Sequence, residues 1–249
     1  MNDALIIKNY PNKPSIQKIA RAGGILYLII IVAGFLGEMF IRGKIVVSGD
    51  AAATANNIIY NQLLWRIGIA GDLLMHICDV PLMVIFYLLL KPVNKHLALT
   101  ALIFNVVQTS ALAINKINLL SPLFISGDAD YMKAFDAGQL QALSYLSIKY
   151  HGYGFSIGLI FFGFTAIILG YLITRSGYIP RAIGVLMQIA GLCYIVNSFV
   201  LIIVPGLSDT LFPWILLPPL IAELSLCLFL IIKGVNINRW QERLISVTG

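Results

Sequence analysis

The chain has 249 residues, of which 59% are hydrophobic and only 11% are charged. Its mean hydropathy of +0.89 excludes a soluble domain of this length, because one globular core cannot bury that much apolar surface. A net charge of +6 alone would fit a nucleic-acid-binding protein, but the Lys and Arg residues are scattered along the loops, so we expect no nucleic-acid partner. The composition predicts an integral membrane protein that contacts the lipid bilayer.

Six stretches are long and apolar enough to cross a bilayer core, which requires about 20 residues of helix. In chain order they are Ala22–Ile41, Ile67–Leu90, Leu97–Leu120, Gly152–Leu172, Ile183–Val204 and Leu211–Ile232. The connecting segments are too short for a second folded domain. We therefore predict an all-α fold in which residues 22–233 form one bundle of six transmembrane helices, flanked by segments 1–21 and 234–249.

The basic residues predict how this bundle is oriented. Eleven of them lie on the side of the predicted bundle where the chain begins and ends, and six lie on the opposite side. Because cytoplasmic loops carry the excess of Lys and Arg, we expect both termini, and hence segments 1–21 and 234–249, to be cytoplasmic. The outer side then carries one or two short amphipathic surface helices, of which one starts after Ser48-Gly49-Asp50 and covers residues 51–65.

The second span contains three ionisable residues inside its apolar run: Asp72, His76 and Asp79. An ionisable group near the middle of a membrane helix is unfavourable by at least about 2.5 kcal/mol, so such groups usually face protein or a wet cavity. Positions i, i+4 and i+7 lie within about 60° of one another on a helix, so the three share one face. Pro81 follows, and its missing N–H predicts a kink near Asp79.

The sixth span repeats this arrangement, because Pro218-Pro219 interrupts its run and Glu223 follows one turn later. We therefore expect a second kinked helix that carries an acid near the middle of the membrane. If the two helices face each other, Asp79 and Glu223 can share a proton, since two close carboxylates in a low dielectric do not both ionise easily. This sharing is a hypothesis.

Three further ionisable residues lie near the outer ends of the spans: Glu38 in the first, Arg66 at the start of the second and His151 at the start of the fourth. Arg66 is a candidate ion-pair partner of Asp72 if the helix entry is bent, because residues six apart are not neighbours on a straight helix. The sequence thus predicts an outward-opening polar pocket lined by Asp72, His76, Asp79 and Glu223, with Arg66, Glu38 and His151 near its mouth.

Three functions fit this pattern. The leading hypothesis is binding or transmembrane handling of a small ligand or cation, which makes an enzyme the less favoured interpretation. A structural or partner-binding protein without a ligand is the second, because buried polar residues often hold membrane helices together. A metal-dependent intramembrane hydrolase, using Asp72, His76 and Asp79 with His151, is the third. No phosphate loop, dinucleotide fingerprint or haem-attachment motif is present, so we expect no cofactor, and the sequence names no protein partner.

Several short patterns together resemble a known family. They are Ala22-Gly23-Gly24-Ile25-Leu26-Tyr27-Leu28, Gly49-Asp50, Phe162-Gly163, Gly170-Tyr171-Leu172, Ser176-Gly177-Tyr178-Ile179-Pro180-Arg181, Gly184-Val185-Leu186 and Ala222-Glu223-Leu224. This set resembles a bacterial family of polytopic membrane proteins known as domain of unknown function 4386, over most of the chain. The loop at 176–181 is the most specific part. The resemblance implies a bacterial inner-membrane location and several transmembrane helices, and it brings no activity, cofactor or catalytic residue.

Overall fold

The computed structural model describes residues 13–127 and 129–248, and within these ranges all regular structure is helical. Six helical segments are long and apolar enough to cross a membrane. They are Ser15–Ile45, Gln62–Leu90, Lys95–Ile125, Ala137–Ser176, Arg181–Ile203 and Trp214–Ile232. The prediction of an all-α, multi-pass membrane fold with six spans is therefore confirmed.

The first span begins earlier than expected and changes its helical type near its C-terminal end. It consists of α2 (Lys13–Phe35), a π-helical turn η1 (Leu36–Arg42) and α3 (Gly43–Ile45). The helix continues ahead of Ala22 because Ile16 and Ala20, one turn apart, are both buried against the bundle. A separate helix α4 (Ala51–Tyr60) follows at the predicted start, where the Asp50 side chain accepts a hydrogen bond from the Ala53 N–H at 2.8 Å.

The middle spans are α5 (Gln62–Leu90), the consecutive pair α6 (Lys95–Asn115) and α7 (Ile117–Ile125), and α8 (Ala137–Ser176). A short 3-10 turn η2 (Asp130–Ala134) precedes α8. With 40 residues, α8 is about 60 Å long, roughly twice the thickness of a bilayer core. Residues 140–150, which lead into the fourth span in the sequence, belong to the N-terminal part of α8 itself. A capping box between Asp136 and Gln139 fixes the start of α8.

The last part of the chain forms α9 (Arg181–Ile203), α10 (Pro205–Leu211), a 3-10 turn η3 (Trp214–Leu216), α11 (Leu217–Ile232) and α12 (Ile237–Thr248). Pro81 lies inside α5, and the kink expected there stays a prediction. The predicted kink at Pro218-Pro219 is wrong, because α11 starts at Leu217 and both prolines lie in its first turn. Proline is favoured there, since the first N–H groups of a helix have no intrahelical partner.

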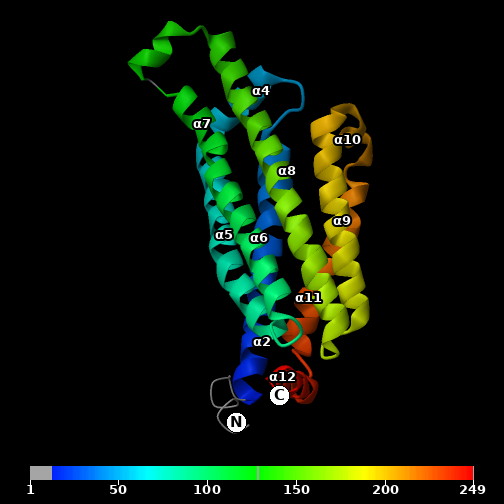
Figure 1. Ribbon diagram of the computed structural model, residues 1–249. Coiled ribbons are helices and arrows are strands. Elements are labelled where there is room, and N and C mark those ends of the chain that lie inside the picture. Colours follow the sequence, from blue (N-terminus) through cyan, green and yellow to red (C-terminus); the bar gives the residue numbers. More distant parts are fainter. Residues whose placement is uncertain (1–12, 128, 249) are drawn as a thin grey trace.

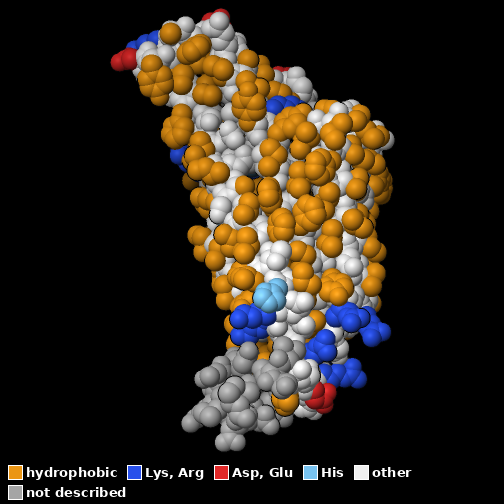
Figure 2. Space-filling model, in the orientation of Figure 1, with side chains coloured by type: hydrophobic (Ala, Val, Ile, Leu, Met, Phe, Trp, Pro, Cys, Tyr) orange, Lys and Arg blue, Asp and Glu red, His pale blue; other side chains and the backbone are white. Residues whose placement is uncertain are grey.

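The six spans form a closed ring in chain order. Helix α2 contacts α5, α5 contacts α6, α6 contacts α8, α8 contacts α9, α9 contacts α11, and α11 returns to α2 (Figure 1). The starting residues of α2 lie at the same end of the bundle as α12, and α4, α7 and α10 lie at the opposite end. We call the first the basic end, because Lys and Arg side chains gather there, whereas apolar side chains cover the middle of the bundle (Figure 2). We call the opposite end the outer end, as a name for its place in the structure.

The basic half of the ring is filled by an apolar core. Leu82, Phe86, Leu172, Leu226 and Leu230 belong to one cluster of buried side chains contributed by α5, α8 and α11. Between α8 and α9, glycines replace side chains: a Cβ atom at Gly170 would lie only 2.5 Å from the carbonyl oxygen of Gly184. These two helices therefore pack backbone against backbone.

Candidate functional site

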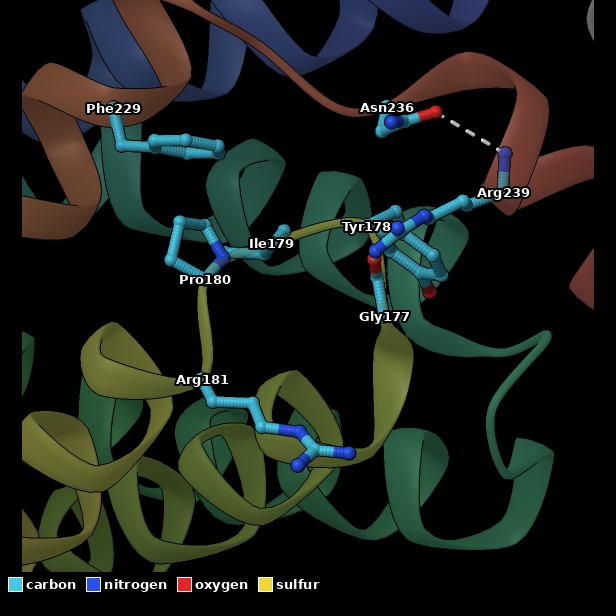
Figure 3. A pocket seen from close by; sticks show the side chains of 8 residues that line it. All are labelled: Gly177, Tyr178, Ile179, Pro180, Arg181, Phe229, Asn236 and Arg239. Carbon is cyan, nitrogen blue, oxygen red and sulfur yellow. Dashed lines mark hydrogen bonds between the residues drawn. The ribbon is translucent and has the colours of Figure 1, made fainter.

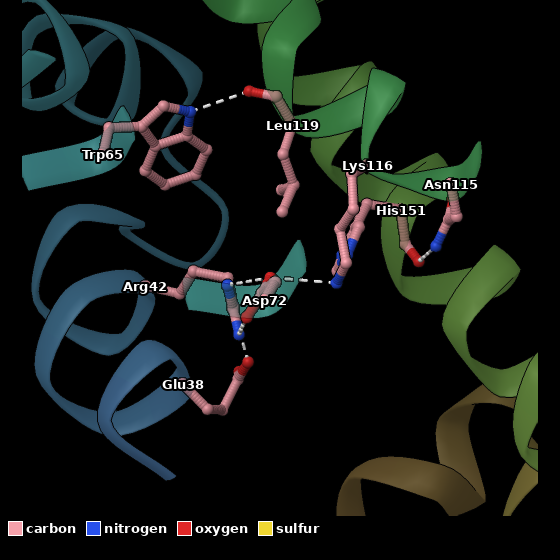
Figure 4. Close-up of polar contacts among 8 residues, drawn as sticks. All are labelled: Glu38, Arg42, Trp65, Asp72, Asn115, Lys116, Leu119 and His151. Carbon is pink, nitrogen blue, oxygen red and sulfur yellow. Dashed lines mark hydrogen bonds and ion pairs between the residues drawn. The ribbon is translucent and has the colours of Figure 1, made fainter. Parts of the chain in front are cut away.

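Asp72 lies at the centre of a network of charged side chains in the outer half of the bundle. It is only 1% exposed, and its carboxylate accepts hydrogen bonds from Arg42 Nη1 at 2.8 Å, Arg42 Nη2 at 3.3 Å and Lys116 Nζ at 2.9 Å. Arg42 also donates from Nε to Glu38 at 2.7 Å, and Lys116 Nζ lies 3.3 Å from His151 Nε2 (Figure 4). We call these five residues the outer charged cluster.

Irregular helix geometry brings the two bases of this cluster inward. Arg42 ends the π-helical turn η1, and such turns are frequent at functional sites. Lys116 occupies the junction where α6 ends and α7 begins, and it is only 3% exposed. A hydrogen bond of 2.7 Å from Trp65 Nε1 to the Leu119 carbonyl fixes α7 against α5 beside it. With two acids and two bases, the cluster is formally neutral when His151 is neutral.

The expected ion pair between Arg66 and Asp72 is wrong, because Arg66 is exposed and Arg42 and Lys116 occupy the carboxylate. The sequence did not pair either residue with Asp72: Arg42 counted only as a basic residue at the outer end of its span, and Lys116 only as a polar residue available in the outer half. The available signal was their position, because Arg42 lies four residues after Glu38 and Lys116 lies within the third apolar run.

Asp79 lies deeper, about 10 Å along α5 from Asp72. It is buried, and its carboxylate accepts a hydrogen bond from the Thr109 hydroxyl and interacts with Asn105, both on α6. The Asn105 amide in turn donates to Gln108 Oε1 at 3.1 Å. The hydrogen-bond partners of Asp79 in the described structure are therefore neutral.

Glu223 on α11 is half-buried, and its hydrogen-bond partner is likewise neutral. Its Oε1 accepts a hydrogen bond of 2.6 Å from the Tyr194 hydroxyl on α9, and Tyr27 on α2 also interacts with it. Asp79 and Glu223, which we call the interior carboxyls, are close enough to interact electrostatically with each other and with Tyr27. Because each carboxyl hydrogen-bonds a different hydroxyl, direct proton sharing between them stays a prediction.

Several buried polar atoms near the interior carboxyls have no hydrogen-bond partner. They are His76 Nε2, Asn105 Oδ1, Asn197 Oδ1 and Ser198 Oγ. His76 precedes Asp79 by three residues, and Asn197 and Ser198 follow Tyr194 by three and four, so all lie within about one helical turn of the interior carboxyls or their partners. Buried polar atoms are normally paired, so such a group indicates a place for water or a ligand.

The structure divides the residues of the predicted pocket between two places. Asp72, Glu38 and His151 belong to the outer charged cluster, Asp79 and Glu223 are the interior carboxyls, and His76 lies between them on α5. Among the described residues, no three His, Cys, Asp or Glu side chains come together as a metal-binding group. The donor set expected for a metal centre is therefore not assembled in that part of the chain.

Sequence comparisons identify the family. The chain belongs to the family Domain of unknown function (DUF4386), whose profile matches residues 22–234. It is also similar to an uncharacterized protein of Archaeoglobus fulgidus, with 29% identity over 131 residues, 52% of this chain and 64% of that protein. The match thus spans less than two thirds of that relative. No solved structure matches the chain at a significant level.

Proposed function

We propose that this member of the DUF4386 family binds a small cation, or a small ligand with a cationic group, at the interior carboxyls within its ring of membrane helices. One contrast supports the proposal. Asp72 is neutralised by Arg42 and Lys116, whereas the described hydrogen-bond partners of Asp79 and Glu223 are neutral. Two acids are therefore available for a positive charge.

The energetics of burial support a cationic occupant. An ionised carboxylate in a low-dielectric interior is strongly unfavourable without a compensating charge, so it either takes up a proton or holds a cation. The unpartnered atoms of His76, Asn105, Asn197 and Ser198 supply additional polar contacts around such an occupant. An acid inside a membrane helix is energetically unfavourable unless another interaction compensates for it. This is the general reason to assign a function to intramembrane acids.

We propose entry from the outer end of the bundle. The path passes Glu38, Arg66 and His151 and continues along Asp72 and His76 to Asp79. In the basic half, the apolar cluster around Phe86 and Leu226 packs the described part of the ring. We place the protein in the bacterial inner membrane with both termini in the cytoplasm, so this entry faces outward.

A structural role without a ligand is the second candidate. The outer charged cluster favours it, because Arg42, Asp72, Lys116 and His151 connect the first, second, third and fourth spans through satisfied contacts. Under this alternative the interior carboxyls are neutral and serve only as hydrogen-bond acceptors for Thr109 and Tyr194.

The deciding experiment measures the thermal stability of the purified full chain in detergent as sodium, potassium or ethylammonium chloride is added. Binding at 100 times the dissociation constant stabilises a protein by about 2.7 kcal/mol. We expect at least one cation to raise the melting temperature of the wild type, and we expect Asp79→Asn and Glu223→Gln to abolish that increase.

Asp130→Asn is the matched control, because it removes one acid from an exposed outer turn. It must keep the cation response of the wild type. Equal responses in the wild type and both interior variants, or no response to any cation, would contradict the proposal and leave the structural role.

A further inference from the structure

The loop between α8 and α9 surrounds a surface hollow that the proposed function does not use. The hollow has a volume of about 410 Å³. It is lined by Gly177, Tyr178, Ile179, Pro180, Arg181, Phe229, Asn236 and Arg239 (Figure 3). Its first five residues come from the loop whose sequence carries the strongest family resemblance.

Hydrogen bonds hold this loop in a fixed shape. Gly177 ends α8 with a positive φ of 77°, a conformation that glycine adopts without strain. The buried Tyr178 hydroxyl donates a hydrogen bond to the Leu89 carbonyl at 2.7 Å, and the backbone carbonyl of Tyr178 accepts one from the Asn236 N–H at 3.2 Å. Arg239 Nη1 donates to the Gly177 carbonyl at 3.0 Å, which ties α12 to the loop. The hollow is therefore preformed.

The rim of the hollow is cationic. Arg181 and Arg239 are both exposed, and neither forms an ion pair with a described acid. Within the described segments at this end, residues 13–21, 91–95, 174–181 and 233–248, Glu242 is the only acid. Guanidinium groups bind phosphate oxygens through paired N–H donors, so two of them around one hollow favour a phosphate group.

The other side of the hollow is apolar. Phe229 comes from the last turn of α11, and Ile179 and Pro180 belong to the loop. The hollow thus lies where the membrane-spanning helices end, with apolar side chains on one side and guanidinium groups on another. An amphiphile whose phosphate group is attached to acyl chains matches both sides.

We propose that this hollow binds the phosphate group of an anionic phospholipid at the basic end of the bundle. The site is separate from the interior carboxyls, so the proposal stands independently of the cation-binding function. Free phosphate shares the same chemistry without the acyl chains, and the experiment therefore has to compare the two sources.

The experiment compares lipid retention by the purified full chain using native mass spectrometry, with phosphatidylglycerol, phosphatidylcholine and inorganic phosphate as probes. We expect the wild type to retain phosphatidylglycerol in preference to phosphatidylcholine, and not to retain phosphate at equal concentration. Each arginine removed is expected to reduce retention roughly fivefold, the effect of one basic residue near an anionic surface. Arg181→Gln is the principal variant, because Arg181 makes no structural hydrogen bond to the described loop, and Arg181→Lys should restore part of the binding.

The double variant Lys18→Gln, Lys95→Gln is the matched control, because it removes two exposed charges from the same end outside the hollow. It must retain phosphatidylglycerol like the wild type. Equal losses in this control and in Arg181→Gln would show that only the general charge of the basic end attracts lipid, and would overturn the proposal. Equal retention of phosphatidylglycerol and phosphatidylcholine would also overturn it. Binding of inorganic phosphate as strongly as phosphatidylglycerol would overturn the lipid assignment and identify the free anion as the ligand.

Discussion

Removing the charge of Asp72 tests the outer charged cluster most directly. Asp72→Asn keeps the size of the side chain but leaves Lys116, which is 3% exposed, without a carboxylate. Among the described residues, the ammonium group then keeps contacts with His151 Nε2 at 3.3 Å and the Phe155 ring at 5.9 Å. Breaking a buried ion pair by removing one partner costs about 3–5 kcal/mol, and we expect a loss of this size.

The contribution of Arg42 to this loss is smaller. Its side chain is 13% exposed, and it keeps a contact of 2.7 Å with Glu38 after the substitution. Lys116→Met alone leaves Asp72 bonded to Arg42, so we expect it to cost about 1.5–3 kcal/mol, the range for hydrogen bonds to charged groups. The double variant Asp72→Asn, Lys116→Met removes both buried charges together. We expect its loss of stability to be smaller than the sum of the two single losses by at least about 2 kcal/mol.

The assay is equilibrium unfolding of the detergent-solubilised chain, followed by helical circular dichroism as a denaturing detergent is added. Arg66→Gln is the control, because Arg66 is exposed and should change stability by less than about 0.5 kcal/mol. A cost for Asp72→Asn as small as that of the control, or simple additivity in the double variant, would refute the assignment of Asp72 as a buried charge held by Lys116.

Two further substitutions test the packing and the loop. Gly170→Ala places a Cβ atom 2.5 Å from the Gly184 carbonyl oxygen. Since that backbone cannot move aside easily, we expect the free energy of unfolding to fall by about 1–3 kcal/mol. Gly71→Ala is the control, because its Cβ atom would meet nothing within 4 Å, and it should not destabilise the protein in the same unfolding assay. Burial raises the pKa of the Tyr178 hydroxyl above its ordinary value of about 10, so its contribution to stability is complete below about pH 10 and is lost as the pH rises towards the folded-state pKa. Tyr178→Phe should lower the free energy of unfolding by about 1 kcal/mol at neutral pH, because the hydrogen bond to the Leu89 carbonyl is lost. As the pH is raised, the melting temperature of this variant should fall less steeply than that of the wild type. Parallel curves of melting temperature against pH would contradict this reasoning.

Much of the fold could be predicted because it depends on local properties of the chain. The length of each apolar run predicts a span, since a bilayer core requires about 20 helical residues. Asp50 predicts the start of α4 through its side-chain cap, and Pro81 predicts a missing donor inside α5. The intramembrane acids are likewise identified by sequence position alone, because Asp72, Asp79 and Glu223 interrupt apolar runs of membrane-spanning length.

The partners of those acids depend on the tertiary structure. Arg42 and Lys116 are 30 and 44 residues away from Asp72 in the sequence, and Tyr194 is 29 residues from Glu223. In a soluble protein the polar face of a helix reveals its rotation, but here both the lipid-facing and the core-facing surfaces are apolar. The sequence therefore determines that six helices cross the membrane. The order of the helices in a closed ring, their rotation, and the division of the acids into a neutralised cluster and two carboxyls with neutral partners follow only from how the helices pack.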